Sequence, residues 1–380
     1  MILRARDSIY RIERLCWMWY KAVIFERVFL MEASVVDMAI VKNKTEGNGL
    51  SSNSHKVVSL FCGAGGLDLG FANAGFEVCY AADYDAAAIK TYNRNHPGDL
   101  GRVVDLLATT VEQLCDSIVE ACGENPEIAG IIGGPPCQGF SRGNTGRHAE
   151  DPRNQLALKY ADIVNSFYHK FGLKFFVFEN VPEIRAQKNK SFLEGLRAEL
   201  SLNFDIYERE LNASNYQVAQ ARRRLFIVGV HKNSGLESFE FPAPSPLKEK
   251  VVIDVINDLP DPVYLSNGLV AESIPYHQNH WTSRPKSKRF ETGEMPVGGR
   301  SFIQLDWNKP SRTVAYGNRE IHVHPNGRRR LSIYEALQLQ GFPFKYVLEG
   351  NMSQQVKQVS NAVPPPVAEK IAQSIMEQVL

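Results

Sequence analysis

The chain has 380 residues, of which 44% are hydrophobic and 22% charged, and this composition excludes a chain that is disordered throughout. Its 43 Lys and Arg nearly balance its 42 Asp and Glu, which excludes a uniformly basic protein but allows a local basic patch. The six cysteines include no C-x-x-C pair, so we expect reduced thiols and no metal site. A chain of this length is expected to form two domains.

Residues 1–55 form an N-terminal extension to which we assign no function. Charged residues interrupt its most apolar stretch, 15–31, which therefore predicts neither a membrane span nor an export signal. We accordingly expect a cytoplasmic protein without a membrane partner. Two interpretations of the extension stay open: a real N-terminal segment, helical or disordered, and a reading frame that starts too far upstream.

The next residues alternate strand and helix patterns. Residues 57–61 predict a buried strand, and a glycine-rich turn at 62–66 leads from it into a helix over 67–74. Such a turn allows close backbone approach, and amides at a helix N-terminus bind carboxylate or phosphate. A second strand ends at Asp83, 17 residues after Gly66, where an acidic residue suits ribose hydroxyls. This pattern indicates a nucleoside-bearing cofactor, although the spacing is neither G-x-G-x-x-G nor a P-loop.

Further strand patterns lie at 128–132, 175–178 and 225–230, and helical patterns lie between them. This alternation predicts an α/β fold built on a doubly wound, mainly parallel sheet. Ligands of such sheets bind beyond the carboxyl ends of the strands. Residues 356–378 predict one long helix that returns to pack on this sheet.

Cys137 stands at the centre of a loop, GGPPCQGFS, that follows the strand ending at Ile132. The glycines and prolines exclude regular structure and indicate a rigid loop. We interpret the cysteine as a nucleophile whose pKa can be lowered at this end of the sheet. The alternative interpretation is a buried structural thiol, which is the usual role of a free cysteine.

Glu179 and an arginine run follow on the next strands. Glu179 comes directly after four apolar residues, so we expect it to be partly desolvated and able to act as a general acid near neutral pH. Arg222 and Arg224 stand two apart on an extended chain and are expected to face one side, with Arg223 facing away. A solvated carboxylate and a solvated basic run are the alternative interpretations.

The sequence changes character after Val230, where prolines become frequent and periodic patterns short. We expect an irregular, smaller domain there. Residues 281–330 carry eleven Lys or Arg against four Asp or Glu, a local net charge of +7 that is typical of a phosphate-binding surface. A solvated basic face remains the alternative. The run HQNHW at 277–281 is rich in groups that can contact base edges.

Six motifs occur in a fixed order along the chain. They are FCGAGG at 61–66, PPCQ at 135–138, ENV at 179–181, Q-x-R-x-R at 220–224, RTV at 312–314 and NAVPP at 361–365. With these motifs the chain resembles the DNA cytosine-5 methyltransferases of the bacterial restriction-modification type over about residues 56–378. The departures are small: Ser59 stands where aspartate is frequent, and Ser360 stands where glycine is frequent.

The resemblance implies transfer of a methyl group from S-adenosyl-L-methionine to carbon 5 of a flipped cytosine in a short duplex DNA sequence, which leaves S-adenosyl-L-homocysteine. Cys137 would attack carbon 6, Glu179 would protonate nitrogen 3, Arg222 would support the loop and the base carbonyl, and Arg224 would buttress the site. The resemblance further implies a monomer, located with the bacterial nucleoid, that protects host DNA from a cognate restriction endonuclease.

The resemblance also implies a Rossmann-like methyltransferase sheet with a second, smaller target-recognition domain. We expect a catalytic and cofactor domain over 56–230, a target-recognition domain over 231–355, and a C-terminal segment, 356–380, that completes the first domain. The expected cofactor-binding residues are Phe61, Gly63, Gly65, Asp83, Tyr84, Asp105, Pro136, Leu156 and Asn361, although plain core packing stays open for Leu156. The expected DNA-binding residues are Ser141, Arg142, Asn144, Arg147, Gln278, Asn279, Lys286, Lys288, Arg289 and Arg312. Residues 141–150 would close over the DNA as a lid.

Other functions fit the sequence less well. A cytosine-5 methyltransferase of transfer RNA shares the motifs, but the Cys-Phe-Thr signature of that branch is absent. An amino-group methyltransferase would want Asp-Pro-Pro-Tyr where this chain has Pro-Pro-Cys. A non-catalytic DNA-binding regulator would not need the intact Cys137, Glu179, Arg222 and Arg224. A thiol redox protein would want a second cysteine near Cys137.

Overall fold

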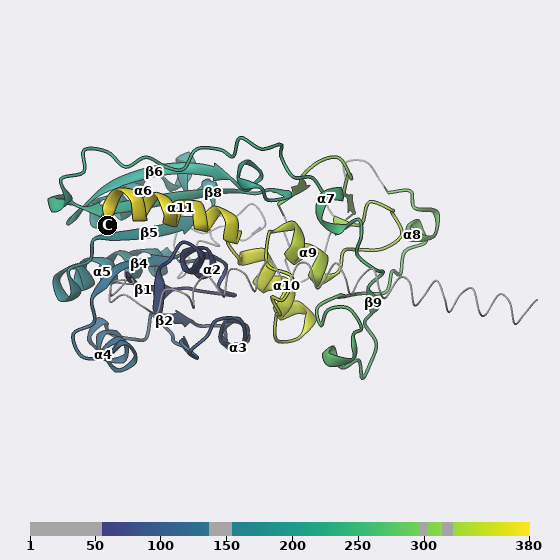
Figure 1. The fold of residues 1–380 in the computed structure, drawn as a ribbon, viewed down its shortest axis with the longest axis horizontal. Coiled ribbons are helices and arrows are strands. Elements are labelled where there is room, and N and C mark those ends of the chain that lie inside the picture. Colours follow the sequence, from purple (N-terminus) through teal and green to yellow (C-terminus); the bar gives the residue numbers. More distant parts are fainter. Residues whose placement is uncertain (1–54, 137–153, 296–301, 314–321) are drawn as a thin grey trace, which may run out of the picture. The chain divides into compact units, whose positions relative to one another are not determined.

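A seven-stranded sheet organises the described part of the chain (Figure 1). The computed structural model describes residues 55–136, 154–295, 302–313 and 322–380. The strands are β1 (Lys56–Leu60), β2 (Glu77–Asp83), β3 (Gly101–Val103), β4 (Ile128–Gly133), β5 (Phe175–Asn180), β6 (Phe204–Asn212) and β8 (Arg223–His231). Their order is β3-β2-β1-β4-β5-β8-β6. Strands β1 to β5 pair in parallel, and β8 lies antiparallel between β5 and β6.

The α/β fold expected from the sequence is therefore confirmed, with its order reversing between β1 and β4. Strands β4 and β5 are buried along their whole length because both faces of the sheet are covered. Two glycines make room for the large rings of β5. A Cβ at Gly130 would lie 2.5 Å from the Phe175 ring, and one at Gly229 would lie 1.9 Å from the Phe176 ring.

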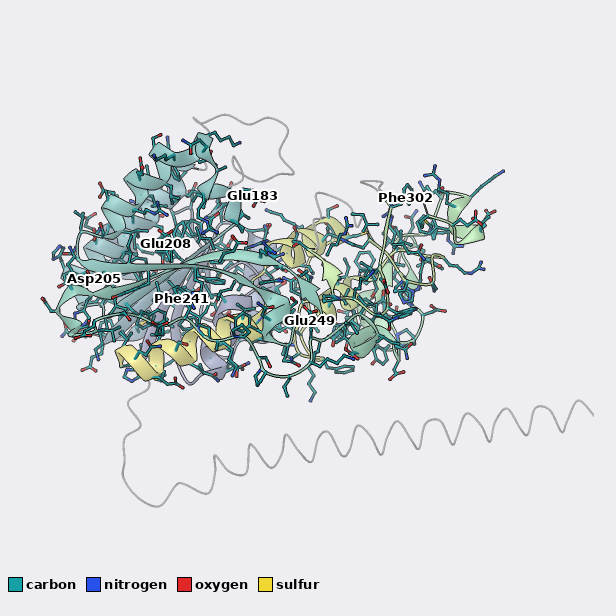
Figure 2. The ribbon with its side chains drawn as sticks, turned by 90° about the horizontal axis from the view of Figure 1, so that it is seen from above. Glu183, Asp205, Glu208, Phe241, Glu249 and Phe302 are labelled. Atoms are coloured by element: carbon teal, nitrogen blue, oxygen red, sulfur yellow. The ribbon has the colours of Figure 1, made fainter. Side chains whose placement is uncertain are left out.

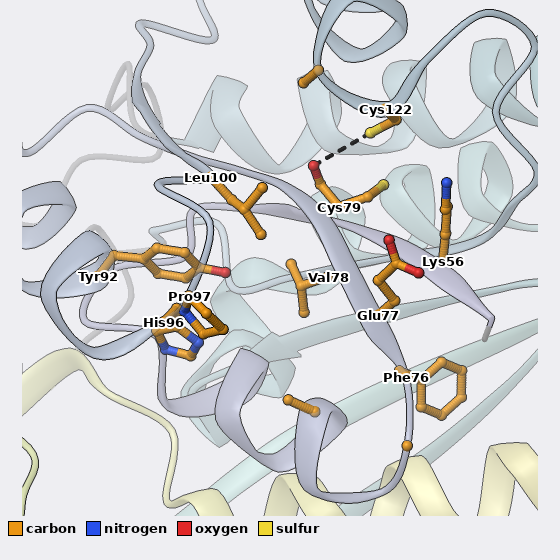
Figure 3. Close-up of a pocket in the computed structure, with 13 residues that line it drawn as sticks. Lys56, Phe76, Glu77, Val78, Cys79, Tyr92, His96, Pro97, Leu100 and Cys122 are labelled. Atoms are coloured by element: carbon orange, nitrogen blue, oxygen red, sulfur yellow. Dashed lines mark hydrogen bonds between the residues drawn. The ribbon is translucent and has the colours of Figure 1, made fainter. Parts of the chain in front are cut away.

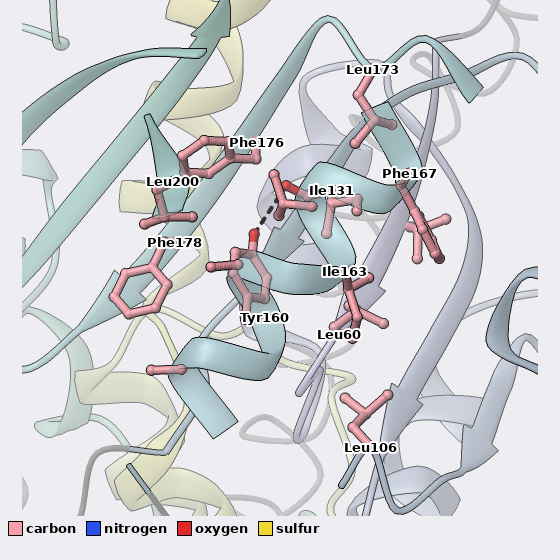
Figure 4. Close-up of a cluster of buried hydrophobic side chains, with 14 of the residues drawn as sticks. Leu60, Leu106, Ile131, Tyr160, Ile163, Phe167, Leu173, Phe176, Phe178 and Leu200 are labelled. Atoms are coloured by element: carbon pink, nitrogen blue, oxygen red, sulfur yellow. Dashed lines mark hydrogen bonds between the residues drawn. The ribbon is translucent and has the colours of Figure 1, made fainter. Parts of the chain in front are cut away.

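Helices cover both faces of the sheet. They are α2 (Gly66–Asn73), α3 (Ala86–Asn95), α4 (Val111–Cys122), α5 (Asn154–Phe171), α6 (Lys190–Leu200) and α11 (Pro365–Val379). Apolar side chains of α4, α5 and α6 pack against one face, and those of α2 and α11 pack against the other. Figure 4 shows the first of these cores, with the Tyr160 hydroxyl near the Ile131 carbonyl at 3.4 Å. The shorter hydrogen bond of this hydroxyl goes to the Val177 carbonyl at 2.7 Å.

Strand β6 forms one edge of the sheet and carries charged side chains, which is a common protection of an unpaired edge. Asp205 and Glu208, both labelled in Figure 2, stand on this strand. Arg197 of α6 donates to both oxygens of Glu208 at 2.6 and 2.7 Å. This bidentate ion pair fixes the helix against the edge strand.

Residues 231–355, here called the distal region, consist of short elements. They are η4 (Lys232–Ser234), α7 (Ile253–Ile256), β9 (Val263–Tyr264), η5 (Ala271–Ser273), β10 (Trp281–Thr282), α8 (Arg289–Thr292), β11 (Ile303–Gln304), β12 (Ser311–Arg312), β13 (His322–Val323) and α9 (Ile333–Leu339). Between the longer strands lie η1 (Pro182–Arg185), η2 (Gln187–Asn189), η3 (Ala213–Tyr216) and β7 (Gln220–Ala221). By their contacts, the described residues form one compact unit, so the predicted division into two domains stays a prediction.

A buried polar network stabilises the distal region where regular structure is scarce. Ser332 and Glu335 cap α9 reciprocally, and Arg329 donates to both oxygens of Glu335 at 2.9 and 2.8 Å. The Glu335 side chain is fully buried, so these bonds replace the water that the carboxylate loses. No helix in the described ranges is long and apolar enough to cross a lipid bilayer.

The expectation of one helix over 356–378 was wrong. The chain forms α10 (Met352–Asn361) and then α11, separated by residues 362–364. Proline residues 364–366 explain the break, because proline has no amide hydrogen for a helix interior but is tolerated in the first turn. Helix α11 packs on the face of the sheet that α2 covers, where Gly70 of α2 lies against Ala368. Helix α10 contacts α3 instead, through the bond from Thr91 Oγ1 to Gln358 Oε1 at 2.6 Å.

Candidate active site

The carboxyl ends of neighbouring strands bring the predicted residues to one edge of the sheet. Leu60 of β1 pairs with Gly133 of β4, and Gly133 pairs with Phe178 of β5. The glycine-rich turn, the Pro-Pro loop and Glu179 therefore follow directly from three adjacent strand ends. This is the position at which parallel sheets bind ligands, next to the reversal of strand order.

Glu179 is a buried carboxyl with a charged partner. Its side chain is 9% exposed, and Arg224 Nε lies 3.0 Å from its Oε1. Burial raises the pKa of Glu179 above its ordinary value, against the opposing effect of the Arg224 and Arg222 guanidinium groups. The carboxyl therefore holds its proton more tightly than a solvated glutamate, as expected for a group that donates a proton near neutral pH.

The loop that leads to Cys137 lies against this carboxyl. A Cβ at Gly134 would come within 2.8 Å of Glu179 Oε2, so glycine lets the loop lie against the carboxyl without displacing it. Asn180 Nδ2 donates to the Pro135 carbonyl at 3.1 Å, which ties the loop to the end of β5. Cys137 and the predicted residues Ser141, Arg142, Asn144 and Arg147 lie outside the described residues.

The arginine run alternates between two environments, as an extended chain should. Arg222 is buried and its Nη2 donates to the Ser360 carbonyl at 2.8 Å. Arg223 is exposed and lies 3.5 Å from Glu210, while Arg224 turns back to Glu179. Strand β7, just before this run, pairs in parallel with β12, so the Q-x-R-x-R and RTV motifs lie side by side.

The glycine-rich turn is fastened to the end of β2 by Asp83. Gly63 N donates to Asp83 Oδ2 at 2.9 Å, and Asp85 N donates to Oδ1 at 2.8 Å. Phe61, Gly63 and Gly65 all have positive φ, of 57°, 55° and 77°. The position where a Gly63 side chain would stand is open space, and Tyr84, which follows Asp83 in the sequence, is 74% exposed. The turn therefore offers bare backbone and one accessible aromatic side chain to a ligand.

The comparisons with known proteins agree with this geometry. Residues 55–377 match the family of C-5 cytosine-specific DNA methylases. The chain belongs to this family. It is 34% identical to the type II methyltransferase M.FnuDI of Fusobacterium nucleatum over 352 residues, which cover 85% of this chain and 94% of the relative. It is 32% identical to M.MthTI of Methanothermobacter thermautotrophicus, over 84% of this chain and 96% of the relative.

Solved structures show the same fold. A prophage-encoded protein of E. coli, described as a DNA modification methyltransferase, superposes with a TM-score of 0.70 at 28% identity and covers 86% of this chain and 99% of its own. The Dnmt2 methyltransferase of S. pombe superposes with a TM-score of 0.58 at 16% identity, over 85% and 98%, and supports the fold alone. The protein is thus a DNA cytosine-5 methyltransferase of the type II restriction-modification kind, and DNA is its substrate.

The remaining cofactor residues predicted for this methyltransferase lie at or near the surface. Asp105 is exposed, and its Oδ1 accepts from Leu107 N at 3.0 Å, which shapes the turn after β3. Pro136 and Leu156 are half-buried, and Asn361 is exposed at the end of α10. The half-burial of Leu156 leaves both of its interpretations open.

The predicted DNA-binding residues that the structure describes differ in exposure. Lys286, Lys288, Arg289 and Arg312 are exposed and carry charge at the surface of the methyltransferase. Asn279 is only 1% exposed, and its amide binds both polar backbone atoms of Leu348 and the Gln355 side chain. Its side chain thus supports the distal region from inside and is not accessible to DNA, contrary to the expectation. Gln278 is half-buried and accepts from Arg94 Nη2 at 2.7 Å.

Sequence reasoning missed three contributors to the methyltransferase site. Asn180 binds the Pro135 carbonyl, and Gly134 lets the loop lie close to Glu179. Both residues stand directly beside motif residues, Glu179 and Pro135, and this position was the signal that could have identified them. Tyr346 was missed because nothing in its sequence surroundings indicates contact with a turn more than 280 residues earlier.

Proposed function

We propose that the protein methylates carbon 5 of a cytosine rotated out of duplex DNA, through a transient covalent bond between Cys137 and the base. The observation that carries this proposal is the buried Glu179 carboxyl, paired with Arg224 and lying against the loop that leads to Cys137. A soft thiolate is suited to this reaction because the aromatic carbon 5 is a poor nucleophile until the ring has been attacked elsewhere.

The Cys137 thiolate bonds to carbon 6 while Glu179 gives its proton to ring nitrogen 3, so that no full negative charge develops on the ring. Carbon 5, now part of an enamine, takes the methyl group. Loss of the proton from carbon 5 to water, cleavage of the bond to sulfur and return of the nitrogen 3 proton to Glu179 restore the aromatic ring, the free thiolate and the protonated carboxyl. Arg222 and Arg224 keep the loop and the carboxyl in place throughout.

The residues present fit S-adenosyl-L-methionine as the methyl donor. When bound, it would supply an electrophilic methyl group and leave as S-adenosyl-L-homocysteine. Asp83 would bind the ribose hydroxyls with the lone pairs that Gly63 N and Asp85 N leave free. Tyr84 would stack beside the adenine, and Asp105 would accept from the adenine amino group. The open space at Gly63 supports this assignment, because a side chain there would fill the proposed site.

The remaining cofactor residues proposed are Phe61, Gly65, Pro136, Leu156 and Asn361. Base flipping follows from the reaction itself, since a thiol cannot reach carbon 6 inside a duplex, and it costs a few kcal/mol. We propose that Lys286, Lys288, Arg289 and Arg312 bind DNA phosphates, helped by Gln278 and by residues 141–147. The local charge of +7 over residues 281–330 supports a phosphate-binding role.

The similarity to type II methyltransferases supports a role in protecting host DNA from a restriction endonuclease that cuts the same sequence. We propose that the enzyme acts as a monomer, separate from this endonuclease, on DNA of the bacterial nucleoid.

The direct test is methyl transfer from tritiated S-adenosyl-L-methionine to duplex DNA and, in a separate reaction, to transfer RNA. We expect label in DNA only, recovered as 5-methylcytosine after digestion to nucleosides. Label in transfer RNA alone would replace the proposal with an RNA methyltransferase. Tight DNA binding without any transfer would replace it with a non-catalytic regulator.

A further inference from the structure

A loop of the distal region reaches the glycine-rich turn at the carboxyl end of β1. The Tyr346 hydroxyl donates to the Ala64 carbonyl, in the middle of the turn, and lies 3.3 Å from His96 Nε2. Tyr346 is 4% exposed, so neither bond competes with solvent. The hydroxyl has a single proton, which goes to the carbonyl, and its oxygen is left to accept from His96.

His96 in turn supports the turn from behind. Its ring stacks on Tyr92 with centroids 4.2 Å apart and planes 10° apart. A Cβ at Gly65 would lie 2.3 Å from His96 Nε2, so the ring occupies the place of the missing side chain. Burial lowers the pKa of His96 to about 4, and the imidazole is therefore neutral at physiological pH.

The position of His96 is not fixed by packing on every side. Tyr92 and His96 also line a cavity of about 510 Å³, together with Pro97 and Leu100 (Figure 3). Apolar contact restrains the ring on its Tyr92 face, whereas Nε2 is held through the polar bond to Tyr346. The bond from Tyr346 is thus a restraint that the surrounding apolar contacts do not supply.

The same loop holds α3, which begins just after Asp83 and Tyr84. Asn95 accepts from Val347 N at 2.9 Å and donates to its carbonyl at 2.7 Å. Thr91 Oγ1 accepts from Glu349 N at 2.7 Å. Residues 346–349 therefore hold both segments that carry the proposed cofactor contacts, the turn through Ala64 and the end of β2 through α3.

We propose that Tyr346 is a positioning residue for the cofactor site: its hydroxyl holds the Ala64 carbonyl and, through His96, the Gly65 backbone in the conformation that S-adenosyl-L-methionine requires. The proposal rests on the proposed use of this cofactor. It assigns part of the cofactor affinity to a residue of the distal region that does not contact the cofactor.

The test compares Tyr346→Phe with a matched control, Tyr216→Phe. Tyr216 is also buried, and its hydroxyl also donates to a backbone carbonyl, that of Pro242 at 2.9 Å. It packs with α11 in one of the two main apolar cores of the sheet. Tyr346→Phe is expected to raise the Kd and KM for S-adenosyl-L-methionine about five- to tenfold, the usual effect of losing one buried hydrogen bond, and to leave the Kd for DNA unchanged. Tyr216→Phe is expected to lower Tm without changing either Kd.

A second variant, His96→Gln, removes the stacked ring and is also expected to weaken cofactor binding. If the two residues act through one restraint, the losses in the double variant will be smaller than the sum of the single losses. Wild-type protein that binds no S-adenosyl-L-methionine would overturn the proposed function itself. Wild-type binding that Tyr346→Phe and His96→Gln retain in full, with only Tm lowered, would overturn the positioning role alone.

Discussion

At the residue scale, the proposed chemistry depends on buried polar side chains whose loss of water is offset by a hydrogen-bonding or charged partner. The four apolar residues before Glu179 correctly predict its desolvation, because the end of a central strand is covered on both faces. The alternation of the arginines was predictable from strand geometry, and Arg224 does pair with Glu179. The interior position of Asn279 was not predictable, since it depends on Leu348, a tertiary partner 69 residues away.

Glu179→Gln tests the proton donor. Glutamine keeps the shape of the side chain but cannot give a proton to nitrogen 3, so we expect kcat to fall about a hundredfold or more. The control is Glu210→Gln, which removes a carboxylate that pairs with Arg185 and Arg223 outside the site. Single-turnover methyl transfer gives both rates. Full activity of Glu179→Gln would remove Glu179 from the mechanism.

Asp68 gives a pH-dependent stability at the same scale. It is fully buried beside Ser59 and Tyr92, and burial raises its pKa from 3.8 to about 6. Between these values the folded state binds more protons than the unfolded state, so this group makes the protein less stable as pH rises from 4 to 6. From pH 4 to pH 7, the unfolding free energy of Asp68→Asn should gain roughly 2 kcal/mol on that of wild type. Urea denaturation at each pH gives both unfolding free energies. A difference between the two proteins that stays constant from pH 4 to pH 7 would contradict the raised pKa of Asp68.

At the element scale, the sequence predicts which segments form strands and helices better than it predicts helix ends and contacts between helices. The strands and most helices follow from apolar periodicity, whereas the break between α10 and α11 was missed although its prolines were visible in the sequence. Contacts between helices were not predictable. From the sequence alone, Gly70 is expected only to destabilise α2. The structure shows that α11 occupies the space that a side chain at this position would need.

Two glycine-to-alanine substitutions separate propensity from packing. A Cβ at Gly70 would lie 2.4 Å from the Ala368 Cβ, whereas nothing lies within 4 Å of one at Gly195 in α6. Alanine favours a helix over glycine by about 1 kcal/mol. We therefore expect Gly195→Ala to raise the unfolding free energy by up to about 1 kcal/mol and Gly70→Ala to lower it by about 1–3 kcal/mol. Equal shifts in Tm for both variants would show that α11 moves away from the added methyl group without loss of stability, and would contradict the packing argument.

At the scale of the whole molecule, the two edges of the sheet differ in function. The carboxyl ends of strands β1, β4 and β5 carry the turn, the Pro-Pro loop and Glu179. At the other end of these strands lie Lys56, Lys174 and Lys232, which have no proposed role. The sequence supports this division through its motifs and through the concentration of charge over residues 281–330. The bonds from residues 346–349 to the cofactor site could not be predicted, because they join segments about 250–280 residues apart.

Removing three charges from each side tests where DNA binds. The triple variant Lys286→Ala, Lys288→Ala, Arg289→Ala should weaken DNA binding at low salt and reduce the slope of log K against log salt by about 2–3. The matched variant Lys170→Ala, Lys174→Ala, Lys232→Ala removes the same charge near the opposite edge and should leave the slope unchanged. If both variants show the same slope of log K against log salt, DNA does not bind at Lys286, Lys288 and Arg289.

The central claim is that Cys137 bonds to carbon 6 of the target cytosine. Duplex DNA in which 5-fluorocytosine replaces the target base tests it most directly, because fluorine at carbon 5 cannot leave as a proton does, and the bond to sulfur then persists. With S-adenosyl-L-methionine present, wild-type protein should form a protein–DNA adduct that survives denaturing electrophoresis, and Cys137→Ser should form none. An adduct formed equally by Cys137→Ser, or none from wild-type protein that methylates ordinary DNA, would contradict the mechanism.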